Sequence, residues 1–289
     1  MKKPIALAIL LLMGSSTVPL RAMDFDNTDF NQRQKVIEEH YARAIQYFND
    51  GSYANAIQHW DEILKLDPEQ TAASRLIKEA RSKLTDQIGP LEETIRSLIK
   101  EGRYETALEK IQTLLERDSK NKSFLATKTR LENISAIRPV ETGNSKSSVL
   151  VRKSLSAHLS IEEDQKMAVN AMRAARDFNP QHPNIDRLIT YIEQQYPDTA
   201  KKELVTPGMS VVENKLFIAL NQIYEGRFDL AIFSCNEVLS LDPTNVLALK
   251  RKGSAYFALN QKDKARENWE QALKLAPEDT EIKKFLSAK

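Results

Sequence analysis

The sequence contains a single cysteine, Cys235, so no disulfide can form within one chain. Glycine and proline are also scarce, at 8 and 11 of 289 residues, which excludes collagen-like and low-complexity classes. Neither sign of charge dominates, because 42 basic and 40 acidic side chains leave a net charge of +2. These shortages predict a globular protein that is held together by packing alone, with no overall field that favours nucleic acid.

Long hydrophobic runs are absent too, apart from a short one near the start. The run from Ile5 to Met13 is too short for a bilayer, which takes about 20 residues. Lys2 and Lys3 precede it, and small and turn-forming residues follow up to Ala22, an arrangement typical of a secretory signal peptide. We therefore expect cleavage after about Ala22 and a periplasmic mature protein in a bacterium. We expect association with the membrane only through partners.

A short phrase occurs three times in the sequence, as LKLDPEQ near residue 64, LSLDPTN near 239 and LKLAPED near 273. Each phrase is typical of the end of an amphipathic helix, because proline keeps the residue before it out of the helical region. Pro243 and Pro277 are 34 residues apart. This period indicates a repeated pair of helices.

The residues between these prolines follow one template. When proline is placed at position 32, small residues fall at positions 8 and 20 and larger ones at 24 and 27. Small residues let two antiparallel helices approach closely, and the larger ones fill the space around them. The matching residues at positions 8, 20 and 24 are Ala44, Ala56 and Trp60, then Ala219, Ala231 and Cys235, then Gly253, Ala265 and Trp269. In period and pattern the chain resembles the tetratricopeptide repeat family.

This resemblance implies an all-α fold, an interrupted solenoid of helical hairpins. Weaker units cover Leu91–Arg117 and Val149–Pro180, and a helix over Thr71–Leu84 is expected to end before Ile88, Gly89 and Pro90. The expected segments are a signal peptide (1–22), N-terminal repeat-like helices (23–135), a linker (136–147), a middle three-helix segment (148–196), a second linker (197–210) and a C-terminal tandem pair with a capping helix (211–289).

The resemblance also implies a binding surface, because the first helices of such repeats line a concave groove. In the last two units the groove positions carry an apolar stripe and one lysine. We therefore expect a peptide or an amphipathic helix of a protein partner to bind there. The candidate partner-binding residues are Leu216, Leu220, Ile223, Tyr224, Leu247, Lys250, Ser254 and Phe257.

Sequence signatures of catalysis are missing. The four histidines, at 40, 59, 158 and 182, lie on different segments without zinc-binding spacing, and no HExxH, GxSxG, CxxC or GxGxxG string occurs. Cys235 falls on a packing position and is expected to be a buried, inert thiol. We therefore assign no catalytic, cofactor-binding or metal-binding residue.

The pattern favours a non-enzymatic interaction scaffold of the bacterial cell envelope. Exported proteins that resemble this family are commonly accessory parts of secretion, pilus, motility or outer-membrane assembly machines, and this association motivates the hypothesis. Two alternatives stay open. One is a homo-oligomeric structural component of such a machine, and the other is an envelope enzyme.

Overall fold

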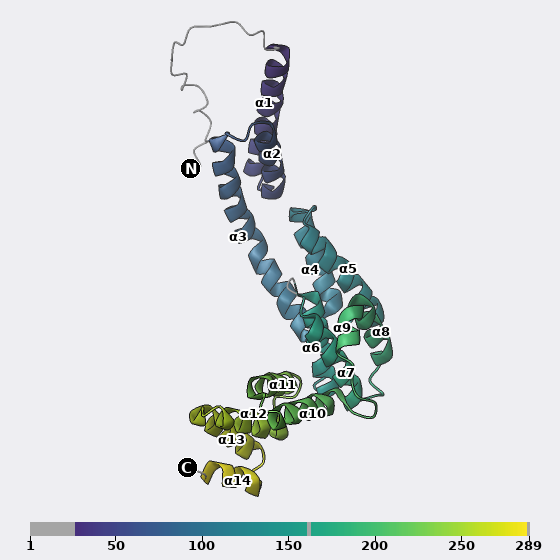
Figure 1. Cartoon of the computed structure of the whole chain (residues 1–289). Coiled ribbons are helices and arrows are strands. Elements are labelled where there is room, and N and C mark those ends of the chain that lie inside the picture. Colours follow the sequence, from purple (N-terminus) through teal and green to yellow (C-terminus); the bar gives the residue numbers. More distant parts are fainter. Residues whose placement is uncertain (1–26, 161–162, 288–289) are drawn as a thin grey trace, which may run out of the picture. The chain divides into compact units, whose positions relative to one another are not determined.

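The structure is a computed structural model that describes residues 27–160 and 163–287 (Figure 1). The predicted signal peptide lies outside these residues. Within them the only β pairing is an isolated bridge between Arg103 and Val140, so the predicted all-α class is confirmed. None of the described helices is both long and apolar enough to cross a membrane.

The helices of the described ranges form consecutive antiparallel pairs. The pairs that follow the repeat template are α1 with α2, α6 with α7, α10 with α11, and α12 with α13. The helices are α1 (Asn27–Asn49), α2 (Tyr53–Leu66), α3 (Thr71–Glu101), α4 (Tyr104–Arg117), α5 (Lys122–Ile137), α6 (Lys146–Leu159), α7 (Gln165–Phe178), α8 (Ile185–Gln195), α9 (Pro197–Lys202), α10 (Val211–Tyr224), α11 (Phe228–Leu241), α12 (Val246–Ala258), α13 (Lys262–Leu275) and α14 (Thr280–Ser287).

Small residues lie where the paired helices come closest. A Cβ atom added to Gly253 would lie only 2.4 Å from Nε1 of Trp269, so the indole ring occupies the space that any other residue at 253 would need. In the first hairpin, Ala44 and Ala56 are both fully buried beside Trp60. The spacing of small and large residues read from the sequence therefore corresponds to real helix–helix contacts.

The turns inside several of the hairpins use a residue with positive φ at position 15 of the repeat. Gly102 and Gly226 have φ values of 77° and 71°, and Asn260 takes the same place in the last repeat with φ 59°. The next residue closes the turn by donating its backbone N–H to a carbonyl five residues earlier, as in Arg227 to Gln222 at 2.8 Å. This is the hydrogen-bond pattern of a left-handed helix cap.

Helix α3 departs from the expectation. It runs from Thr71 to Glu101 with Pro90 inside it, so the predicted end before Ile88 is wrong. An interior proline costs about 3 kcal/mol in an isolated helix. Here Ile88 and Leu91 on either side of Pro90 pack against a buried cluster that includes Ile95. We attribute the continuity of the helix to this packing.

The chain divides into two compact units between Arg81 and Ser82, inside α3. The first unit has its own core around Trp60 and Ile63. In the second unit one large cluster extends from Ile95 through the middle helices to Leu241, and smaller clusters lie between the C-terminal helices. The predicted segment boundaries stay predictions. The predicted second linker is partly helical, because it contains α9.

The two turn glycines provide a matched test of backbone strain against crowding. Gly226→Ala should lower the free energy of unfolding by about 1–2 kcal/mol, because its φ is unfavourable for alanine but no atom lies within 4 Å of the new Cβ. Gly102→Ala should cost at least about 1 kcal/mol more, because its Cβ would lie 1.9 Å from the carbonyl oxygen of Glu141. Urea unfolding of both variants measures the difference. Equal losses would contradict the crowding at Gly102.

Candidate functional site

The predicted binding residues lie on α10 and α12, the first helices of the last two repeats. Both helices begin with a side-chain cap. Ser210 and Glu213 form a reciprocal capping box at α10, with hydrogen bonds of 3.2 and 2.8 Å. Asn245 accepts the Ala248 N–H at 2.9 Å at the start of α12. These caps satisfy backbone groups that are otherwise unpaired at a helix start, so local sequence fixes where both helices begin.

The apolar candidates differ in exposure. Tyr224 is 80% exposed, and Leu247 and Phe257 are each 42% exposed. Leu220 and Ile223 are half-buried, and Ile223 packs against Ala231, Ile232 and Ala255. We call the set Leu220, Ile223, Tyr224, Leu247 and Phe257 the α10–α12 surface.

Leu216 does not contribute to this surface. It is 7% exposed and packs with Val238 and Ala248. Its backbone carbonyl accepts a hydrogen bond of 2.6 Å from Arg251 of α12, which ties the two helices together. The structure therefore places Leu216 in the core between the last two repeats.

The polar candidates are occupied within the chain. Lys250 donates to Asp279 at 2.9 Å and also to Glu281, at the start of α14. Burial alone would lower the pKa of Lys250, but these two carboxylates outweigh it and raise the pKa. Ser254 donates to the Lys250 carbonyl at 3.1 Å. Lys250, which was predicted to provide a positive charge in the binding groove, is thus already paired within the chain.

Two buried titratable groups, His158 and Cys235, have pKa values shifted by their surroundings. His158 lies between the hydroxyls of Tyr196 and Tyr191, at 2.7 and 3.0 Å, and burial together with the charge of Arg130 lowers its pKa to about 4. Burial raises the pKa of Cys235 to about 12, as expected of an inert thiol. Among the described residues, no group of three or more His, Cys, Asp or Glu side chains is arranged to hold a metal ion.

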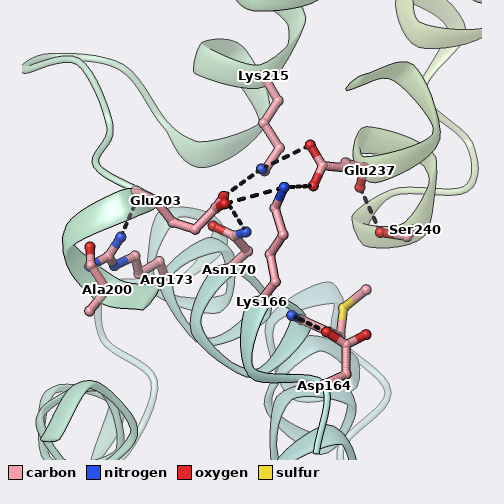
Figure 2. A network of polar contacts seen from close by, with 10 residues as sticks. Asp164, Lys166, Asn170, Arg173, Ala200, Glu203, Lys215, Glu237 and Ser240 are labelled. Carbon is pink, nitrogen blue, oxygen red and sulfur yellow. Dashed lines mark hydrogen bonds and ion pairs between the residues drawn. The ribbon is translucent and has the colours of Figure 1, made fainter. Parts of the chain in front are cut away.

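A ring of four charges joins the middle helices to the C-terminal pair (Figure 2). Lys166 of α7 contacts Glu203 at 3.2 Å and Glu237 of α11 at 2.5 Å. Lys215 of α10 contacts the same two carboxylates at 2.9 and 3.4 Å. Each lysine therefore touches both glutamates, and we call this arrangement the charge ring.

The segment around Glu203 is held by further hydrogen bonds. Asn170 donates to the Glu203 carboxylate at 2.8 Å, and Arg173 donates to the Glu203 carbonyl at 2.6 Å. Burial alone would raise the pKa of Glu203, but the hydrogen bonds from Asn170 and Lys215 and the charges of Lys215 and Lys166 outweigh it and lower the pKa. This part of the predicted linker is therefore docked against α7 and α10.

Two adjoining cavities of about 250 and 340 Å³ lie beside the charge ring. Both are lined by Lys166, Lys215 and Glu237, together with Asn170 and the half-exposed ring of Phe233. Neither cavity includes any of the eight predicted binding residues. The predicted surface and these cavities are therefore separate features.

Sequence reasoning missed the charge ring, although one signal was available. Val211, Lys215 and Ala219 are spaced by four residues along α10, and all three are buried. A lysine in such a buried row needs a partner carboxylate. The identity of that partner could not be read from the sequence, because Glu203 and Glu237 lie on other elements.

Removal of one charge should destabilise the second unit. Lys215→Met leaves two partly desolvated carboxylates with a single cation, so we expect a loss of about 2–4 kcal/mol in the free energy of unfolding. Lys110→Met, at an exposed lysine of α4, is the control and should change it by less than about 0.5 kcal/mol. Urea unfolding compares the two. A Lys215→Met variant as stable as the control would show that the ring contributes nothing.

Comparison with known proteins finds a family match for the hairpin of α12 and α13. Residues 246–279 match the family model described as Tetratricopeptide repeat. This range contains α12 and α13, and it begins at Val246, where the unit predicted from the proline spacing also begins.

The curated relatives match over short stretches. Peptidyl-prolyl cis-trans isomerase FKBP42 of Arabidopsis thaliana is 44% identical over 62 residues, which is 22% of this chain and 17% of that protein. A DnaJ homolog subfamily C member 7 homolog of Schizosaccharomyces pombe is 35% identical over 95 residues, or 32% and 18% of the two proteins. FKBP4 of Mus musculus is 40% identical over 72 residues, or 25% and 16%. The chain thus spans less than a fifth of the length of these relatives.

Two solved structures align over most of the chain at low similarity. The TPR2AB-domain:pHSP90-complex of yeast Sti1 has 11% identity and a TM-score of 0.28, covering 88% of this chain and 82% of that one. The MamA protein has 13% identity and a TM-score of 0.22, covering 86% and 96%. What the comparisons show is therefore one tetratricopeptide repeat, at residues 246–279, in a chain whose other described helices also form hairpins.

Proposed function

We propose that this chain is a non-enzymatic scaffold that binds a peptide or an amphipathic helix of a protein partner on the α10–α12 surface. The observation that carries the proposal is the exposure of Tyr224, Leu247 and Phe257 on the first helices of two neighbouring repeats. Large apolar side chains that gather outside the core usually mark a contact. An amphipathic helix can cover such side chains with residues spaced by three and four.

Apolar contact is the main source of affinity in this proposal. Asp279 and Glu281 already occupy Lys250, so a carboxylate of the partner would have to displace them. Ser254 is also engaged within α12. The partner is therefore selected by the shape and hydrophobicity of its helix, and polar groups at the rim set its orientation.

The location of this scaffold is part of the same proposal. The signal-peptide pattern of residues 1–22 supports export to the periplasm, and the repeat supports an accessory role in an envelope machine. The isomerase activity named for two relatives is not carried over, because the chain spans less than a fifth of their length.

A model peptide tests the binding surface. The probe is a fluorescent amphipathic helix with leucine at i, i+3, i+4 and i+7, and the reference is a scrambled peptide of the same composition. Anisotropy should show saturable binding of the first peptide and at least about tenfold weaker binding of the second, equivalent to about 1.4 kcal/mol. Tyr224→Asp and Leu220→Asp should abolish the preference, because a carboxylate cannot be buried against the peptide.

Leu230→Asp is the matched control, because Leu230 is a similarly exposed apolar residue on α11 and lies outside the surface. It should leave binding unchanged. Circular dichroism and the unfolding temperature establish that the variants fold. Equal binding of both peptides, or an equal loss in the control, would overturn the proposed surface. Light scattering measures the molar mass of the unliganded chain. A mass of more than one chain would indicate the alternative, a homo-oligomer in which a second copy covers the surface.

Export is tested separately. When the full chain is produced in a Gram-negative host, the protein should be recovered in the periplasmic fraction. Mass spectrometry should find its N-terminus near Met23, because signal peptidase removes the preceding residues. An intact N-terminus in the cytoplasmic fraction would refute the assignment of the signal peptide.

A further inference from the structure

Two of the four histidines meet across the first hairpin, inside the first compact unit. His40 of α1 and His59 of α2 lie with their Nδ1 atoms 2.9 Å apart. Their ring centroids are 5.1 Å apart, and both side chains are half-buried. The spacing of histidines in the sequence gave no sign of this pair, because its members come from facing helices.

The contact constrains the protonation of the two rings. A nitrogen of a neutral imidazole is either a donor or an acceptor. At 2.9 Å the two Nδ1 atoms cannot both carry a proton, and two bare lone pairs would repel each other. One ring therefore donates its Nδ1–H to the other, and the pair shares a single proton along the line between the rings.

A metal ion can replace this proton. Nitrogen ligands lie about 2.0–2.1 Å from a bound transition metal, so two of them that enclose a right angle are about 2.9 Å apart. This is the observed separation of the Nδ1 atoms. Right angles between neighbouring ligands are typical of square-planar and octahedral Ni²⁺ and Cu²⁺, both of which accept imidazole. On binding, the shared proton would move to the far nitrogen of its ring.

No third side-chain ligand is assigned. Glu62 follows His59 by three residues on α2, but its carboxylate is bound to Lys65 at 2.7 Å. Among the described residues, no group of three or more His, Cys, Asp or Glu side chains is arranged to hold a metal ion, so water would fill the remaining positions.

We propose that His40 and His59 bind one Ni²⁺ or Cu²⁺ ion through their Nδ1 atoms, with water at the remaining positions. Tyr47, which stacks on the His59 ring with centroids 5.4 Å apart, holds this imidazole in place. The site lies in the first unit and is independent of the α10–α12 surface. Binding of metal would clamp α1 to α2 and so stabilise the first hairpin.

Calorimetric titration of the untagged chain with Ni²⁺, and then with Cu²⁺, tests the proposal. We expect one saturable site per chain and a rise in the unfolding temperature with added metal. His40→Ala and His59→Ala should each weaken binding at least about tenfold, which corresponds to about 1.4 kcal/mol. His182→Ala is the control, because this histidine faces Glu141 in the second unit, and it should keep wild-type affinity.

The proposal is overturned if no saturable binding is found, or if His40→Ala and His59→Ala bind metal as well as the wild type does.

Discussion

The close approach of two antiparallel helices at small residues is the contact on which the rest of this structure depends. The ring of Trp269 lies over Gly253, and the ring of Trp60 lies beside Ala44 and Ala56. In both hairpins a large ring fills the space that the small residues leave open. Interiors are packed as densely as organic crystals, so this fit admits little variation. A single hairpin exposes apolar surface on its outer faces. In a repeat protein the neighbouring hairpins cover this surface.

The parts of the fold that arise from neighbouring residues could be predicted from the sequence. Helices α12 and α13 form the hairpin that the spacing of Pro243 and Pro277 predicts, and Gly253 and Trp269 meet at its positions 8 and 24. Pro90 was misread, because local preference for a helix end was outweighed by packing on either side of it. The charge ring and the histidine pair could not be foreseen, because they join residues on separate elements.

The candidate binding surface shows the same limit. The repeat template assigns Leu216 and Tyr224 to one row, yet one is buried by the following repeat and the other is almost fully exposed. Lys250 has the residue type of a basic edge, but it is paired with Asp279, which precedes α14, and with Glu281 in the first turn of α14. A template gives the direction of a side chain, whereas exposure and charge depend on the other segments of the chain that pack beside it.

The alternation of signs in the charge ring also constrains how these positions can change over time. Any single loss leaves two like charges with one counterion, whereas the joint loss of one lysine and one glutamate leaves a complete ion pair. Drift at residues 166, 203, 215 and 237 should therefore be correlated, with substitutions arriving in compensating pairs. The orientation of the C-terminal repeats on the middle helices is then inherited as one unit, although its four determinants are scattered along the gene.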